Sequence, residues 1–136
     1  MQVSEIMHKG VSIAQINDSI QHVANIMKKE DIGIMPVYKN ERPVGMVTDR
    51  DIVVSCLANG KGAHEPISLA MTRDIISVHD FDDISLAQKL MNDNQISRLL
   101  VMDKGETPVG MLTLHDLARN SQNATMKANI LDQVKR

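Results

Sequence analysis

Residues 43–51 read Pro-Val-Gly-Met-Val-Thr-Asp-Arg-Asp, and residues 108–116 read Pro-Val-Gly-Met-Leu-Thr-Leu-His-Asp. The repetition extends upstream, because a shift of 64 residues places Met7 on Met71 and Met27 on Met91. One extra residue near Thr107 raises the shift to 65 and aligns the two blocks. Self-similarity at a fixed spacing indicates a duplicated structural unit. The sequence therefore predicts two related halves, each ending in a block with a glycine, a threonine and an aspartate.

The length of the chain predicts one domain built from the two repeats. A chain of 136 residues fits a single domain, and a repeat of roughly 55–60 residues is near the lower limit for folding alone. We therefore expect the halves to pack face to face around a shared core. The predicted organisation is a first repeat over 1–58, a linker over 59–65, a second repeat over 66–120, and a C-terminal tail over 121–136 that is helical.

Composition narrows the class of protein. The net charge of −2 carries no basic surplus, which argues against nucleic acid as the main partner. No apolar run approaches 18 residues and the N-terminus lacks a signal-peptide pattern, so we expect a cytoplasmic protein without a membrane span. Cys56 is the only cysteine, and we expect a buried structural residue and not a nucleophile. The five histidines form no HxxxH or HExxH pair, so no metal site is predicted within the chain, and a site assembled between chains stays open.

Hydrophobic periodicity predicts a mixed α+β (α/β) fold with the order strand, helix, strand, strand, helix in each half. In the first repeat we expect a strand over 11–16, a helix over 19–30, strands over 33–38 and 44–48, and a helix over 49–57. In the second repeat we expect a strand over 75–78, a helix from residue 84, strands over 97–102 and 109–113, and a helix over 114–120. Asp18 and Gln21 are expected to form a capping box at the first long helix.

The block at 43–51 combines groups that suit a nucleotide. A strand ends at Thr48 and a helix follows directly, so unpaired backbone N–H groups there attract an anion such as phosphate. Thr48 can donate its hydroxyl, Arg50 supplies a cation, and Gly45 allows close backbone approach. Asp51 is a pure acceptor that suits a vicinal diol such as ribose. These residue types predict binding of a nucleotide monophosphate group.

The second block repeats this pattern with Thr113 and Asp116, and with His115 in place of Arg50. A purely structural interpretation is also open, because Thr-x-x-Asp is nearly a capping box. Duplication copies helix caps as faithfully as it copies binding sites. The two copies weaken the structural interpretation without removing it.

The paired Gly-x-x-Thr-x-x-Asp blocks, the turns at Met7 and Met71 and the element order resemble the CBS domain family, named after cystathionine β-synthase. The resemblance covers residues 3–120 and implies a tandem pair, or Bateman module, whose two small sheets pack with pseudo-two-fold symmetry and leave two clefts. It implies that Thr48 and Asp51 serve one cleft and Thr113 and Asp116 the other, with threonine on phosphate and aspartate on the ribose of an adenosine ligand.

The resemblance also implies a basic residue at the start of the middle strand, aimed at phosphate. Arg98 fits that place in the second repeat, whereas the first repeat has Ile34. We therefore expect the two clefts to differ in affinity. Arg50 and Arg98 favour AMP, ADP or ATP over S-adenosylmethionine, and no cofactor is required. The family also implies a homodimer, formed through the helices over 19–30 and 84–94, and a regulated protein whose identity the sequence does not give.

The sequence thus predicts a regulatory protein that binds an adenine nucleotide and is not an enzyme. A different class stays open, in which the clefts are vestigial and the chain is a structural or partner-docking module. A small hydrolase ranks last, because no nucleophile is paired with a base or a metal set in the sequence.

Overall fold

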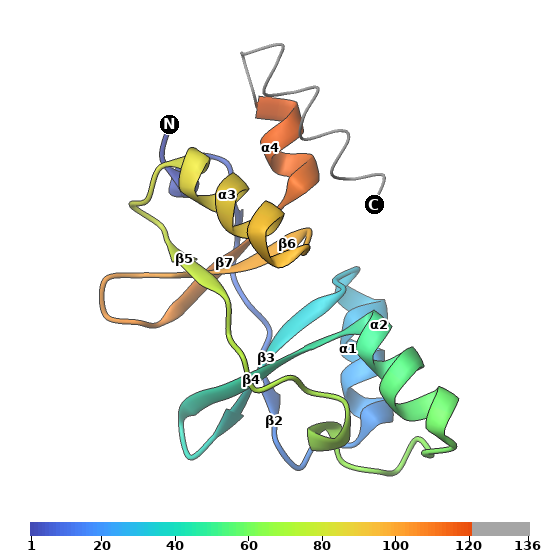
Figure 1. Cartoon of the computed structure of the whole chain (residues 1–136). Coiled ribbons are helices and arrows are strands. Elements are labelled where there is room, and N and C mark those ends of the chain that lie inside the picture. The colour runs from blue at the N-terminus through green and yellow to red at the C-terminus, as the bar shows by residue number, and fades with distance from the viewer. Residues whose placement is uncertain (121–136) are drawn as a thin grey trace. The chain divides into compact units, whose positions relative to one another are not determined.

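The structure is a computed structural model that describes residues 1–120 (Figure 1), so the helix predicted over 121–136 lies outside the described residues. The chain divides into two compact units. Within the described residues, the first-repeat unit is Ser12–Ile75, and the second-repeat unit joins Met1–Val11 to residues 76–120. Each unit has the predicted order strand, helix, strand, strand, helix around one small sheet. The mixed α/β fold expected from the sequence is confirmed.

The sheet of the first-repeat unit has three strands. Their order is β2 (Ala14–Gln15), β3 (Ile34–Lys39) and β4 (Arg42–Thr48). Strand β2 runs parallel to β3, and β4 returns antiparallel to it. The strand predicted over 11–16 is therefore confirmed only for its last part.

Two helical segments belong to this sheet. Helix α1 (Ile20–Glu30) connects β2 to β3, and α2 (Asp49–Asp51) follows β4 directly. After that single turn the chain continues as a π-helical segment, Ile52–Cys56, and a 3₁₀ turn, Leu57–Asn59. The helix predicted over 49–57 is present but leaves α geometry after its first turn.

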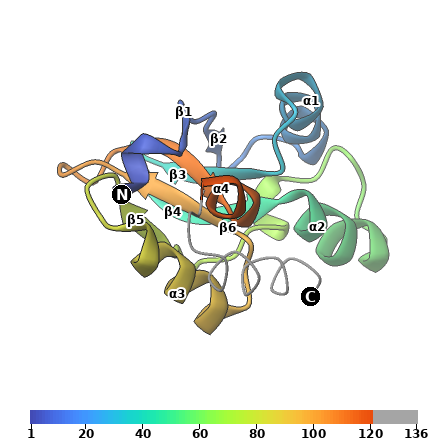
Figure 2. The ribbon, with the colours of Figure 1, turned by 90° about the horizontal axis from the view of Figure 1, so that it is seen from above.

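The second-repeat unit has a four-stranded sheet covered by two helices. The strand order is β1 (His8–Lys9), β7 (Pro108–Thr113), β6 (Arg98–Met102) and β5 (Ser77–His79). Helices α3 (Ile84–Asn94) and α4 (Leu114–Asn120) lie on the same side of this sheet (Figures 1 and 2). Both helices contribute buried residues to one cluster with β6 and β7, which explains why they share a face.

The two hairpins confirm the duplication and locate its extra residue. Strands β3 and β4 are joined by Asn40 and Glu41, which both have positive φ. Two such residues form the tight turn whose twist matches a two-stranded ribbon. The hairpin of β6 and β7 uses a longer loop, and there Glu106 has positive φ. The change of offset near Thr107 is thus a difference in turn length.

The helix caps differ from the prediction in one detail. Ser19 is the N-cap of α1 and its hydroxyl accepts the N–H of His22 at 3.1 Å. Asp18 instead accepts the N–H of Gln15 at 2.8 Å, so the capping box of Asp18 with Gln21 is wrong. An aspartate that bonds a backbone group nearby stabilises a turn, and here it closes the turn between β2 and α1.

Each unit has one hydrophobic cluster of buried side chains. Val23, Met35 and Val47 are fully buried in the first-repeat unit, and Leu99 and Leu112 in the second. Because each sheet covers one of its faces with its own helices, each cluster closes within its unit. The shared core that the sequence predicts between the two halves stays a prediction.

Each unit takes a short segment from the part of the chain that precedes the other repeat. Val3 is buried in the second-repeat cluster, and Ile67 in the first-repeat cluster. The compact units are therefore not the same stretches of chain as the sequence repeats, whose boundaries stay a prediction.

The glycines of the repeated block admit these segments. A Cβ atom on Gly45 would lie 2.4 Å from the carbonyl oxygen of Thr72, and one on Gly110 would lie 2.4 Å from the carbonyl oxygen of His8. Thr72 forms an antiparallel β-bridge with Met46, the neighbour of Gly45. Strand β1 likewise pairs antiparallel with β7, where His8 lies opposite Met111, the neighbour of Gly110. The close approach predicted at Gly45 is thus made by the protein's own backbone.

We expect Gly45→Ala to destabilise the fold by about 1–3 kcal/mol, the usual cost of forcing extra volume into a packed site. The added methyl group meets backbone, which cannot swing away as a side chain can. Gly62→Ala is the matched control, because nothing lies within 4 Å of its Cβ position. Urea unfolding measures both variants, and equal stability of the two would contradict the packing argument.

A pH effect is expected at the end of β5. The ring Nε2 of His79 bonds Glu106, and the ring stacks on Phe81 with centroids 4.9 Å apart. The hydrogen bond to Glu106 raises the pKa of His79 above its usual 6.5. Because the pKa is higher in the folded state, protonated His79 stabilises the fold, fully so below pH 6.5. This contribution to the free energy of unfolding is lost as the pH rises through the raised pKa of the folded state. NMR titration should show a lower His79 pKa in Glu106→Gln, and an unchanged pKa would contradict this assignment.

Candidate ligand-binding site

Thr48 and Asp51 lie at the junction of β4 and α2 and bond each other reciprocally. The Thr48 N–H donates to Asp51 Oδ2 at 2.9 Å, and the Asp51 N–H donates to Thr48 Oγ1 at 3.0 Å. This is the capping box that the structural interpretation predicted. The Thr48 hydroxyl hydrogen is still available, because the oxygen acts only as an acceptor in this pair.

Thr113 and Asp116 repeat this geometry at the junction of β7 and α4. The Thr113 N–H donates to Asp116 Oδ2 at 2.9 Å, and the Asp116 N–H donates to Thr113 Oγ1 at 3.2 Å. Both copies of the motif therefore stabilise the start of a helix. Capping and ligand binding are compatible only where the carboxylate has capacity left for a second partner.

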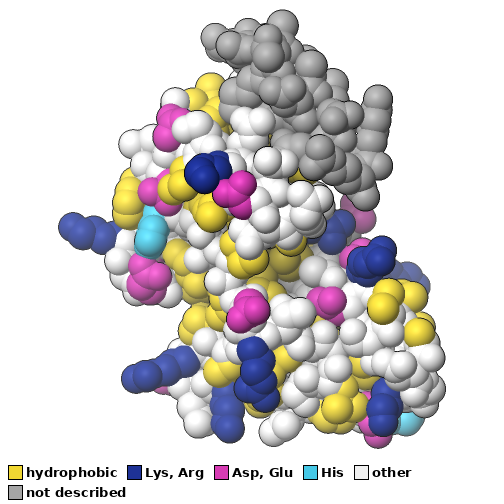
Figure 3. Space-filling view, viewed as in Figure 1, with side chains coloured by type: hydrophobic (Ala, Val, Ile, Leu, Met, Phe, Trp, Pro, Cys, Tyr) yellow, Lys and Arg dark blue, Asp and Glu magenta, His cyan; other side chains and the backbone are white. Residues whose placement is uncertain are grey.

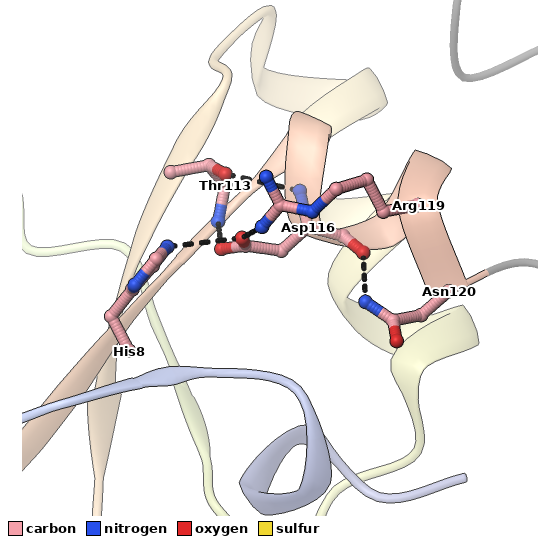
Figure 4. Close-up of polar contacts among 5 residues, drawn as sticks. All are labelled: His8, Thr113, Asp116, Arg119 and Asn120. Carbon is pink, nitrogen blue, oxygen red and sulfur yellow. Dashed lines mark hydrogen bonds and ion pairs between the residues drawn. The ribbon is translucent and has the colours of Figure 1, made fainter.

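The carboxylate of Asp116 has two further partners from its own unit (Figure 4). The ring Nε2 of His8 lies 3.0 Å from Asp116 Oδ1, and a guanidinium nitrogen of Arg119 donates to the same oxygen. The side chain of Asp116 is only 1% exposed, whereas His8 and Arg119 are 64% and 65% exposed. Both exposed side chains thus bond a carboxylate that is itself buried.

Asp51 is different, although its motif has the same backbone geometry. Its side chain is half-buried, and within residues 1–120 its Oδ1 atom has no hydrogen-bond partner. Thr72 occupies the place of His8, because it bridges to Met46 as His8 pairs with Met111. The 65-residue shift places Val54 where the second repeat has Arg119. Neither residue bonds Asp51 in the described part of the chain.

The remaining predicted site residues are placed as follows. Arg50 and His115 are exposed on the first turns of α2 and α4. Arg98 is the first residue of β6 and lies opposite Thr113 on β7, just as Ile34 lies opposite Thr48. The structure therefore brings Arg98 to the second motif, a neighbourhood that the sequence left open.

Two residues of this cluster were missed by sequence reasoning. His8 is distant in sequence, and only the pairing of β1 with β7 brings it to Asp116. Arg119 follows Asp116 by three residues in α4, and this helical spacing is a signal that sequence reasoning could have used.

A metal-binding cluster and a membrane-spanning helix are both absent from residues 1–120. Residues 1–120 hold no group of three or more His, Cys, Asp or Glu side chains placed to bind a metal ion. No helix in that range is long and apolar enough to cross a membrane. Figure 3 shows basic and acidic side chains interspersed on the face drawn. Cys56 is buried as predicted, and this burial, with the Glu65 carboxylate, raises the pKa of its thiol.

The difference between the two carboxylates predicts different costs of removing them. Asp51→Ala should cost about 0.5–2 kcal/mol, the scale of a lost helix cap. Asp116→Ala should cost about 1.5–3 kcal/mol more, the scale of hydrogen bonds to charged groups. Thr48→Ala and Thr113→Ala are matched controls that should cost the same as each other. Chemical unfolding measures all four variants, and equal losses for the two aspartates would count against the cluster.

Comparison with known proteins gives the family. A sequence model of the CBS domain matches residues 3–57 and again 67–123. The CBS domain-containing protein YhcV of Bacillus subtilis is 31% identical over 132 residues, which cover 97% of this chain and 94% of the relative.

Solved structures agree with this match. The CBS domain pair of protein MJ0100, in complex with 5′-methylthioadenosine and S-adenosyl-L-methionine, is 29% identical with a TM-score of 0.78, over 88% of this chain and 94% of that one. Hypoxic Response Protein I with two coordinated zinc ions is 28% identical with a TM-score of 0.77, over 89% of this chain and 99% of that one. The predicted resemblance is confirmed, and this chain belongs to the CBS domain family as a pair of CBS domains.

Proposed function

We propose that this chain is a regulatory, non-catalytic CBS pair that binds an adenosine nucleotide and passes its occupancy on as a change in shape or assembly. The observation that carries the proposal is the state of Asp51. Its carboxylate is held in place by the Thr48 N–H at 2.9 Å, yet its other oxygen has no partner within residues 1–120. Such a group is oriented in advance and still able to accept hydrogen bonds.

The chemistry of the motif supports an adenosine-containing ligand. A carboxylate accepts hydrogen bonds from both hydroxyls of a ribose, and the Thr48 hydroxyl can donate to the 5′ substituent. Arg50 is exposed beside these groups and supplies the charge that a 5′-phosphate needs. The chain has one tyrosine, one phenylalanine and no tryptophan, so the base would be held mainly by aliphatic side chains.

The ligands of the relative MJ0100 support an adenosine-containing ligand for this chain and name the alternatives to a phosphorylated one. Its printed ligands, 5′-methylthioadenosine and S-adenosyl-L-methionine, share the ribose and adenine of AMP but lack a phosphate. Arg50 in the first motif favours the phosphorylated ligands in this chain. A regulatory effect then requires that the ligand bind two states of the protein unequally.

A docking module remains the second candidate. Both Thr-x-x-Asp motifs form complete capping boxes, which is all that a vestigial site would need. The helical segments after α2 also expose apolar side chains, with Val53 54% and Leu57 62% exposed. These features suit a protein partner, and ligand measurements separate the two candidates.

The proposal predicts a thermal shift with an adenine nucleotide. A ligand at about 100 times its Kd adds roughly 2.7 kcal/mol of stability, which raises the Tm of a domain of this size by several degrees. The panel is AMP, ADP, ATP, 5′-methylthioadenosine and S-adenosylmethionine, with GMP as the control for the base. We expect AMP, ADP or ATP to give the largest shift and Asp51→Asn to abolish it.

The aromatic composition offers a check for ligand carried through purification. Because the chain has a single tyrosine and no tryptophan, a bound adenine would dominate the ultraviolet spectrum at 260 nm. Preparations free of this absorbance that show no shift with any panel member would contradict the proposal and favour the docking module.

A further inference from the structure

We propose that only the first of the two motifs binds ligand, because His8 and Arg119 close the second by occupying the carboxylate of Asp116. This inference rests on the proposed function and specifies which copy of the motif carries it. It predicts one adenosine ligand per chain, bound through Thr48 and Asp51.

The closure follows from the hydrogen-bond capacity of Asp116. Its Oδ2 atom accepts the Thr113 N–H at 2.9 Å, and its Oδ1 atom accepts from both His8 and Arg119. A ribose diol needs carboxylate lone pairs that point to open space. Asp116 is 1% exposed and its Oδ1 atom is already bonded, so a ligand would have to displace His8 and Arg119 to use that oxygen.

The first motif shows what the second would be without this closure. It has the same two reciprocal hydrogen bonds, so the difference does not come from the capping geometry. It has Thr72 and Val54 at the places of His8 and Arg119, and neither bonds Asp51 within residues 1–120. His8 and Arg119 are thus the side chains that decide whether the carboxylate is available.

Arg98 does not make the Asp116 carboxylate available to a ligand. It lies opposite Thr113 in the register of β6 and β7, so it adds another cation to the same neighbourhood. A cation beside Thr113 attracts a phosphate, but it does not free the acceptor that a ribose requires. The second motif therefore keeps its part in folding, as the anchor of β1 and α4, while its ribose position is taken.

Isothermal titration calorimetry with AMP and with 5′-methylthioadenosine tests this inference on four proteins. They are the unmodified chain, Asp51→Asn, Asp116→Asn, and the double variant His8→Thr with Arg119→Val. The double variant gives the second motif the residues that the first motif has at the same places. Circular dichroism confirms folding, and the double variant keeps the test valid if Asp116→Asn fails to fold.

We expect one site per chain in the unmodified protein, at least a tenfold loss of affinity in Asp51→Asn, and unchanged affinity in Asp116→Asn. The double variant should bind two ligands per chain. Binding that survives Asp51→Asn and is lost in Asp116→Asn would overturn the inference while leaving the proposed function intact. A folded double variant that still binds one ligand would also overturn it. No heat with either probe in any variant would overturn the proposed function as well.

Discussion

The role of each repeated motif depends on which hydrogen bonds its aspartate carboxylate makes at the junction of a strand and a helix. In both repeats the aspartate takes the N–H of a threonine three residues earlier, and that bond fixes where its oxygens lie. The hydrogen-bond acceptor capacity that remains on the carboxylate decides whether the aspartate only caps its helix or can also bind a ligand. Asp51 keeps one oxygen without a protein partner in the described residues, whereas Asp116 gives its second oxygen to His8 and Arg119. Two nearly identical motifs therefore have different chemistry.

Much of the fold was predictable because it follows from short-range patterns. The duplicated blocks predicted two similar units, and apolar spacing predicted α1, α3 and the central strands within a few residues. The threonine and aspartate were also correctly placed at strand-to-helix junctions. The prediction was wrong where neighbouring residues can make the same local contact. The sequence predicts Asp18 as the cap of α1, whereas Ser19 caps that helix. The sequence also predicts one helix after Thr48, but the chain changes to π-helical geometry after Asp51.

The parts that the sequence did not predict depend on long-range pairing. Nothing in the spacing of residues shows that the first eleven residues join the second-repeat unit, or that Ile67 completes the first core. Gly45 and Gly110 are the sequence features that best indicate this arrangement. Each lets a backbone carbonyl oxygen approach to a position where a Cβ atom would clash. The same pairing brings His8 to Asp116, so this contact could be found only in the structure.

Duplication explains why both motifs persist with different partners. Each copy caps its helix through the same threonine and aspartate, while some of the surrounding residues differ between the copies. Thr72 and Val54 do not bond Asp51 within residues 1–120, whereas His8 and Arg119 both bond Asp116. A crystal structure with the adenine nucleotide that gives the largest thermal shift is the most direct test. The account predicts ribose density on Asp51 and none at Asp116, and a ribose on Asp116 with His8 and Arg119 displaced would contradict it.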